Sequence, residues 1–154
     1  MKELSWHPPE KWCAAEILEH LYLTYAGTSQ GLSRVFESGI VEKRSTLKQR
    51  IATLLAVQWG YFPSGVQSPA VARPKGIPCE KIIAEIGSKV EQMDAIMARC
   101  EDQFGARAKV LEHPFLGPFS IAQWRKFHFR HGMHHLKQIR GFRQTMQKIW
   151  LENQ

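Results

Sequence analysis

Apolar residues recur at the three-to-four-residue spacing of an amphipathic helix through most of this chain. No segment shows the sustained alternation of apolar and polar residues that is typical of a half-buried strand. The pattern predicts helices at about residues 10–38, 41–59, 79–104 and 121–151. Four helices of this length without a sheet indicate one all-α domain over residues 1–154, folded as a four-helix bundle.

Turn-forming residues separate these helices. Pro8 and Pro9 precede the first helix, Gly39 is placed to end it, and Ser120 is placed to cap the last. Residues 60–78 contain four prolines and three glycines and are expected to be irregular. A loop of this length in a small domain often shapes a functional pocket. The stretch HPFLGPFS at 113–120 is expected to be a second hinge.

Four of the seven histidines fall within residues 128–135, in the stretch HFRHGMHH. On a helix, positions i and i+4 share a face, so His131 and His135 lie together on the apolar stripe. The arginine and lysine side chains of this segment lie towards the other side. Two buried imidazoles one turn apart need partners, and such an HxxxH pair can converge on a cation. His128 is a reserve ligand at the edge of the stripe, and His134 is expected outside the metal's coordination sphere.

A bundle site needs a third ligand from a facing helix, and His20 is the histidine that the first helix offers. The alternative for His20 is a core histidine bonded to a backbone carbonyl. Glu16, one turn earlier, is a candidate fourth ligand, hydrogen-bond acceptor or general base; the alternative is a surface glutamate near a helix N-terminus. Cys13 is a candidate nucleophile or a small core residue. Four aromatic residues are either pocket walls or ordinary core and loop anchors: Trp59, Tyr61, Phe62 and Phe119.

Three features together resemble the DinB/YfiT-like superfamily of metal-binding four-helix bundles. They are Trp12 eight residues ahead of His20-Leu21, the motif HPFLG before the last helix, and the pair His131/His135 followed by Gln138. The resemblance implies that His20, His131 and His135 bind a divalent metal. Known members include thiol-S-transferases and a maleylpyruvate isomerase that uses low-molecular-weight thiols. Many members carry a further helix ahead of the first motif, whereas only eleven residues precede Trp12 here, so the packing order of the helices is left open.

Three histidine ligands leave one coordination position open, which is typical of catalytic rather than structural zinc sites. We therefore expect a metal-dependent transferase or hydrolase that acts on a small molecule, with a low-molecular-weight thiol as cosubstrate in the transferase case. Glu16 and Gln138 are the candidate catalytic side chains. Imidazole ligands favour zinc or nickel and are also compatible with iron or copper. The alternative is a non-catalytic bundle, in which the metal only ties two helices together in a stress-response or interaction module.

The remaining composition narrows the choice of partner and location. The net charge of +7 suits a polyanionic partner, but no nucleic-acid-binding motif accompanies it, and a solvated basic face is the simpler interpretation. Three cysteines at unpatterned spacings fit a reducing cytoplasm, with no secretory signal and no apolar run that could cross a membrane. A homodimer remains open.

Overall fold

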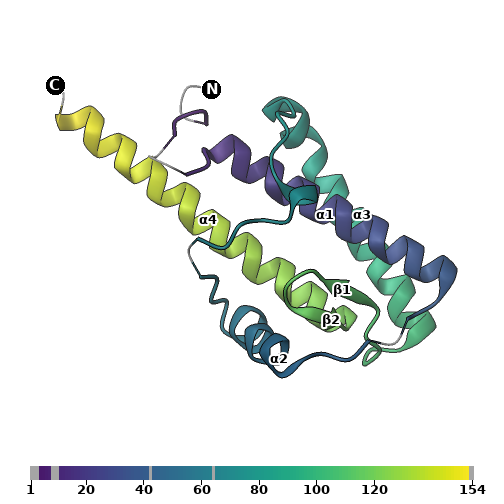
Figure 1. The fold of residues 1–154 in the computed structure, drawn as a ribbon. Coiled ribbons are helices and arrows are strands. Elements are labelled where there is room, and N and C mark those ends of the chain that lie inside the picture. Colours follow the sequence, from purple (N-terminus) through teal and green to yellow (C-terminus); the bar gives the residue numbers. More distant parts are fainter. Residues whose placement is uncertain (1–3, 8–10, 42, 64, 153–154) are drawn as a thin grey trace.

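The computed structural model describes residues 4–7, 11–41, 43–63 and 65–152. Three long helices dominate it: α1 (Ala14–Ser38), α3 (Cys79–Phe104) and α4 (Ile121–Glu152). Helices α1 and α3 pack side by side, and α4 contacts both (Figure 1). The mostly helical fold expected from the sequence is thus present, and the predicted bounds of the third and fourth helices hold to within one residue. The expected start of the first helix at residue 10 lies outside the described residues, but residues 11–13 are not helical, so α1 begins later than expected, at Ala14.

Glycine ends two of these helices, as the sequence indicated for the first. Gly39 follows α1 and Gly105 follows α3, each with φ of 85°, a backbone conformation that side chains with a Cβ rarely adopt. At the start of α4, Ser120 and Gln123 cap the helix reciprocally. The backbone N–H of Ser120 donates to the Gln123 side chain, and the N–H of Gln123 donates to the Ser120 hydroxyl.

The second predicted helix is much shorter than expected. Helix α2 covers only Leu47–Thr53 and runs directly into a single π-helical turn, η1 (Leu54–Gln58). Thr46 sets the start, because its hydroxyl accepts the N–H of Gln49 while the Gln49 side chain accepts the N–H of Thr46. The prediction of a helix from residue 41 was therefore wrong, since a capping pair further along the chain begins it.

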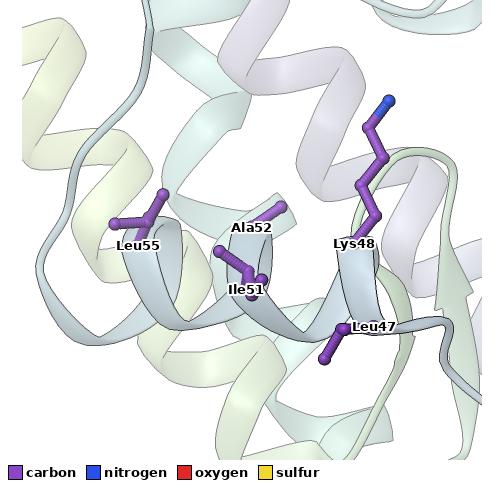
Figure 2. A pocket seen from close by; sticks show the side chains of 5 residues that line it. All are labelled: Leu47, Lys48, Ile51, Ala52 and Leu55. Carbon is purple, nitrogen blue, oxygen red and sulfur yellow. The ribbon is translucent and has the colours of Figure 1, made fainter.

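The apolar stripe of α2 also faces solvent rather than the core. Leu47 is 72%, Ile51 54% and Leu54 47% exposed, while Ala56 and Val57 are the buried residues of this segment. A shallow depression of about 410 Å³ lies over the helix (Figure 2). Its lining carries no histidine, cysteine or carboxylate that could bind a metal, so it is not the candidate metal site: Leu47, Lys48, Ile51, Ala52 and Leu55.

The expectation of no sheet was wrong at the HPFLGPF stretch. Strands β1 (Leu111–His113) and β2 (Gly117–Phe119) form an antiparallel hairpin, in which Leu111 pairs with Phe119. Gly117, with φ of 81°, starts the second strand. Strands of three residues are too short to show an alternating pattern in the sequence. The hairpin places Phe119 in the core, so the expected hinge is instead a fixed structural element.

The main core lies where α1, α3, α4 and the hairpin meet. It includes the fully buried Leu32, Met97, Phe119 and Ile121, with Trp124 at 4% exposure. The described residues of the 60–78 segment are irregular, as expected, apart from one 3₁₀ turn, η2 (Ala70–Ala72), which lies against α1. Among the described residues, no helix combines the length and the apolar character that a membrane span requires.

Candidate metal centre

Three histidine rings meet between α1 and α4. His20 comes from α1, and His131 and His135 come from successive turns of α4. The Nε2 atom of His131 lies 3.2 Å from that of His20 and 3.0 Å from that of His135. Each residue offers a ligand atom within 4.8 Å of those of the other two. The structure thus brings together the three ligands that the sequence singled out, and this buried group could hold a metal ion.

The other ring nitrogens of two of these histidines are tied to fixed acceptors. The Nδ1 atom of His20 lies 2.7 Å from the carbonyl oxygen of Ala72, and that of His135 lies 2.7 Å from Oε1 of Gln138. A carbonyl oxygen only accepts, so each Nδ1 must carry the proton and each Nε2 presents a lone pair. The hydroxyl of Ser68 lies 3.2 Å from the same Nδ1 of His20. Nδ1 of His131 is buried without a partner among the described residues.

Burial keeps these rings neutral. It lowers the pKa of His20, and together with the neighbouring His20 it lowers the pKa of His135 to about 4. Burial and the adjacent His135 hold the pKa of His131 well below its usual range. At neutral pH the Nε2 lone pairs of uncharged His20 and His135 therefore face Nε2 of His131, which can donate to them in the metal-free protein and bind a metal with them once it loses that proton.

Three imidazole nitrogens arranged in this way can also hold a cation. Two nitrogens bound to one tetrahedral zinc ion lie about 3.3 Å apart, given Zn–N bonds of about 2.0–2.1 Å. The separations of 3.0 and 3.2 Å are close to this value. The donor set and its geometry therefore fit a divalent metal.

Aromatic rings surround the three histidines. Trp12 lies 5.3 Å from His20, and Phe127 stacks on His131 at 5.2 Å with an interplanar angle of 14°. Phe62 lies 5.6 Å from His131 and 5.1 Å from His134, so it is a wall of the site. The other aromatic candidates are not walls: Trp59 is 68% and Tyr61 57% exposed, and Phe119 is fully buried in the core.

The two remaining histidines of the cluster lie outside the group. His134 packs against Phe62, and burial lowers its pKa. His128 is only 5% exposed and packs on Trp124 and Tyr25 instead. His128 and His134 therefore have surroundings different from those of His131 and His135, although all four lie on α4.

Glu16 is occupied at the N-terminus of α1. Its carboxylate accepts the backbone N–H of Cys13 at 2.8 Å and lies 3.5 Å from Nδ1 of His7. Glu16 thus caps α1, whereas the alternative considered for it was a surface glutamate near a helix N-terminus. His7, Cys13 and Glu16 also offer ligand atoms within 4.8 Å of one another, a grouping that the sequence did not suggest. Cys13 is 4% exposed and precedes the first residue of α1.

Sequence reasoning missed Glu19, which fixes the loop beside the site. This residue is 3% exposed, and its carboxylate accepts the backbone N–H groups of Lys75 at 2.6 Å and Gly76 at 3.1 Å. It thereby attaches the 60–78 loop to α1 next to His20, and the same loop supplies the Ala72 carbonyl. A buried carboxylate must find donors, but the sequence offered no sign that distant backbone groups would provide them.

We expect Glu19→Gln to destabilise the protein by about 1–3 kcal/mol, because the amide cannot accept both N–H groups as a carboxylate does. Metal affinity should fall as well, since the Ala72 carbonyl is held less firmly. Urea unfolding and metal titration would measure the two effects. Glu37→Gln, at an exposed position of the same helix, is the matched control. Equal stability of both variants would show that Glu19 does not anchor the loop.

The amino-acid sequence matches one family model, described as Protein of unknown function (DUF1569), over residues 1–141. The chain therefore belongs to this family. The searches of curated proteins and of solved structures returned no significant match. The family description assigns no activity, so function must be argued from the geometry of the site.

Proposed function

We propose that this member of the family is a metal-dependent enzyme that acts on a small molecule at a site formed by His20, His131 and His135. The convergence of their Nε2 atoms, with two of the three Nδ1 atoms tied to acceptors, carries the proposal. Zinc or nickel suits this all-imidazole set best. We also propose that the fold is DinB/YfiT-like, because two of the three motifs that suggested it, Trp12 with His20 and His131/His135 with Gln138, supply residues of this site.

The number of ligands favours catalysis over a purely structural metal. The group contains three histidines, and among the described residues no cysteine or carboxylate adds a fourth ligand. Structural zinc sites usually have four protein ligands, whereas catalytic sites keep one position open for substrate or water. A metal with such a position can activate water or hold a thiol as thiolate, so both a hydrolase and a thiol transferase are consistent with the site.

The side chains around the site have separable tasks in this proposal. Ala72 and Gln138 hold the rings of His20 and His135 in the tautomer that presents Nε2 inward. The rings of Trp12, Phe62 and Phe127 limit the access of water to the three histidines. Of the two candidate catalytic residues, Gln138 touches a ligand ring, whereas Glu16 would have to leave its cap on Cys13 to act as a base.

A non-catalytic role remains the second candidate, because the three histidines join α1 to α4 across the bundle. A metal there would tie the two helices together. The two candidates differ in what fills the fourth coordination position: solvent or substrate for the enzyme, a protein group for the tie.

Elemental analysis of protein purified without a metal-affinity tag tests the site, and a turnover assay with a panel of thiols and electrophiles tests the chemistry. We expect about one zinc or nickel ion per chain, and turnover that chelation removes. One bound metal without turnover of any panel member would favour the helix tie. Protein that cannot retain any divalent metal would contradict both roles.

Gln138→Ala should weaken metal affinity or turnover by roughly tenfold or more while leaving most of the metal bound. The amide accepts the proton of His135 Nδ1 at 2.7 Å, so its loss frees the ring to rotate or to change tautomer. Competition with a chelator would measure affinity. Gln144→Ala, at an exposed position of the same helix, is the matched control. Identical affinity in the two variants would remove Gln138 from the site.

A further inference from the structure

A second pocket lies among α1, α3 and α4, on a part of the bundle that the three-histidine group does not use. Its volume is about 250 Å³. Tyr25 contributes from α1, Val90, Met93 and Met97 contribute from α3, and His128 and Phe129 contribute from α4. Apart from the charged Asp94 and Arg125, the lining is thus mostly apolar, with a single imidazole among sulfur-containing and aromatic side chains. This combination is typical of small-molecule sites, in which a few polar groups orient a ligand.

His128 is the unusual member of this lining. It is 5% exposed, and neither of its ring nitrogens has a hydrogen-bond partner among the described residues. Its ring stacks on Trp124 at 5.5 Å with an angle of 24° and lies 5.4 Å from Tyr25. A phenylalanine could make the same ring contacts without leaving two buried polar atoms unpaired. The histidine therefore costs stability that its packing does not explain, as is common for residues kept for function.

The two charged side chains of the lining, Arg125 and Asp94, are paired with each other, and Arg125 also pairs with Glu101. The Arg125 guanidinium donates to Asp94 at 3.0 Å and to Glu101 at 2.5 Å. Burial lowers the pKa of His128 to about 3, so this ring is neutral too. The pocket consequently offers no free charge to an ionic ligand, whereas a neutral imidazole can donate through one nitrogen and accept through the other.

We propose that this pocket binds a small neutral aromatic molecule whose one polar group hydrogen-bonds to His128. The aromatic body packs against Phe129 and the thioethers of Met93 and Met97, which make favourable contacts with rings. The pocket is open to solvent on one side, and its volume of about 250 Å³ gives room for one substituted ring. The site is independent of the metal proposal, because His128 is not part of the three-histidine group.

Phenol and toluene provide the test, because they share a shape and differ in a single hydroxyl group. Titration followed by amide NMR shifts should place both near Tyr25 and Phe129, with phenol bound roughly tenfold more tightly, as one added hydrogen bond allows. In His128→Phe, the preference for phenol over toluene should be lost, because the phenol hydroxyl then has no partner. The variant should also unfold at a higher denaturant concentration than the unaltered protein, which shows that it folds.

A second variant blocks the pocket without altering the imidazole. Val90 lies on the pocket lining and is 41% exposed, so Val90→Phe should fill the space and weaken phenol binding at least tenfold without disturbing the core. Ile83→Phe, on the same helix at 58% exposure and outside the lining, should leave binding unchanged. The proposal is overturned if phenol does not bind, if its shifts map elsewhere, or if His128→Phe retains the preference for phenol over toluene.

Discussion

Replacing His135 with alanine is expected to abolish metal retention and any turnover that depends on the metal. The substitution removes one of three ligands, and two histidines on different helices bind a divalent ion far more weakly than three. It also frees Nε2 of His131, which lies 3.0 Å from the lost nitrogen, and leaves Gln138 without its partner. Metal stoichiometry after dialysis, and turnover with thiols and electrophiles, would measure the effect.

His134→Ala is the matched control for this experiment. It removes an adjacent histidine of the same helix that lies outside the three-histidine group, so metal content should stay close to that of the unaltered protein. Both variants should fold, because alanine favours a helix and the core of Leu32, Met97 and Phe119 is untouched. Turnover that persists in metal-free His135→Ala would place the chemistry elsewhere. Equal metal loss in both variants would contradict the assignment of ligands.

Acidification from pH 7 to pH 5 is expected to remove a large part of the stability of the metal-free protein. Burial lowers the pKa of His113 to about 4 and that of His128 to about 3, from 6.5 in the unfolded chain. The unfolded state therefore binds protons that the folded state does not. This contribution is complete above pH 6.5 and is lost as the pH falls towards the folded pKa.

Contacts in the structure support the same direction. Nδ1 of His113 accepts the N–H groups of Phe115 at 3.2 Å and Leu116 at 3.3 Å, so a proton on that nitrogen would break both hydrogen bonds. Each of the two histidines then lowers the free energy of unfolding by about 1.4 kcal/mol for each pH unit below 6.5. At pH 5 the two histidines together lower the free energy of unfolding by about 4 kcal/mol. The free energy of unfolding of a typical protein is about 5–15 kcal/mol.

Urea unfolding in the presence of a chelator, at pH 7, 6 and 5, would measure this loss. His128→Phe provides the control, because it removes one of the two titrating rings and should reduce the pH dependence by about 2 kcal/mol between pH 7 and 5. A metal-free protein that is equally stable at all three pH values would show that these histidines are not desolvated in solution.

The sequence by itself determined the helical class and the identity of the three metal-ligand candidates. Amphipathic spacing follows from the geometry of a single helix, so it can be read without knowledge of any contact. The same geometry put His131 and His135 on one face, and the capping residues at Gly39 and Ser120 fixed two helix ends. Local signals of this kind survive folding because they do not depend on what packs against them.

Tertiary contacts decided the rest. The apolar stripe of α2 predicted burial, but no described element covers Leu47 or Ile51, and the core is completed instead by a hairpin whose strands are too short to leave a pattern. His128 and His131 lie one turn apart on the same helix, yet one meets the rings of Trp124 and Tyr25 and the other meets His20. The partners of a buried polar group come from distant parts of the chain, and only their packing in three dimensions determines whether a histidine can bind a metal or lines a pocket.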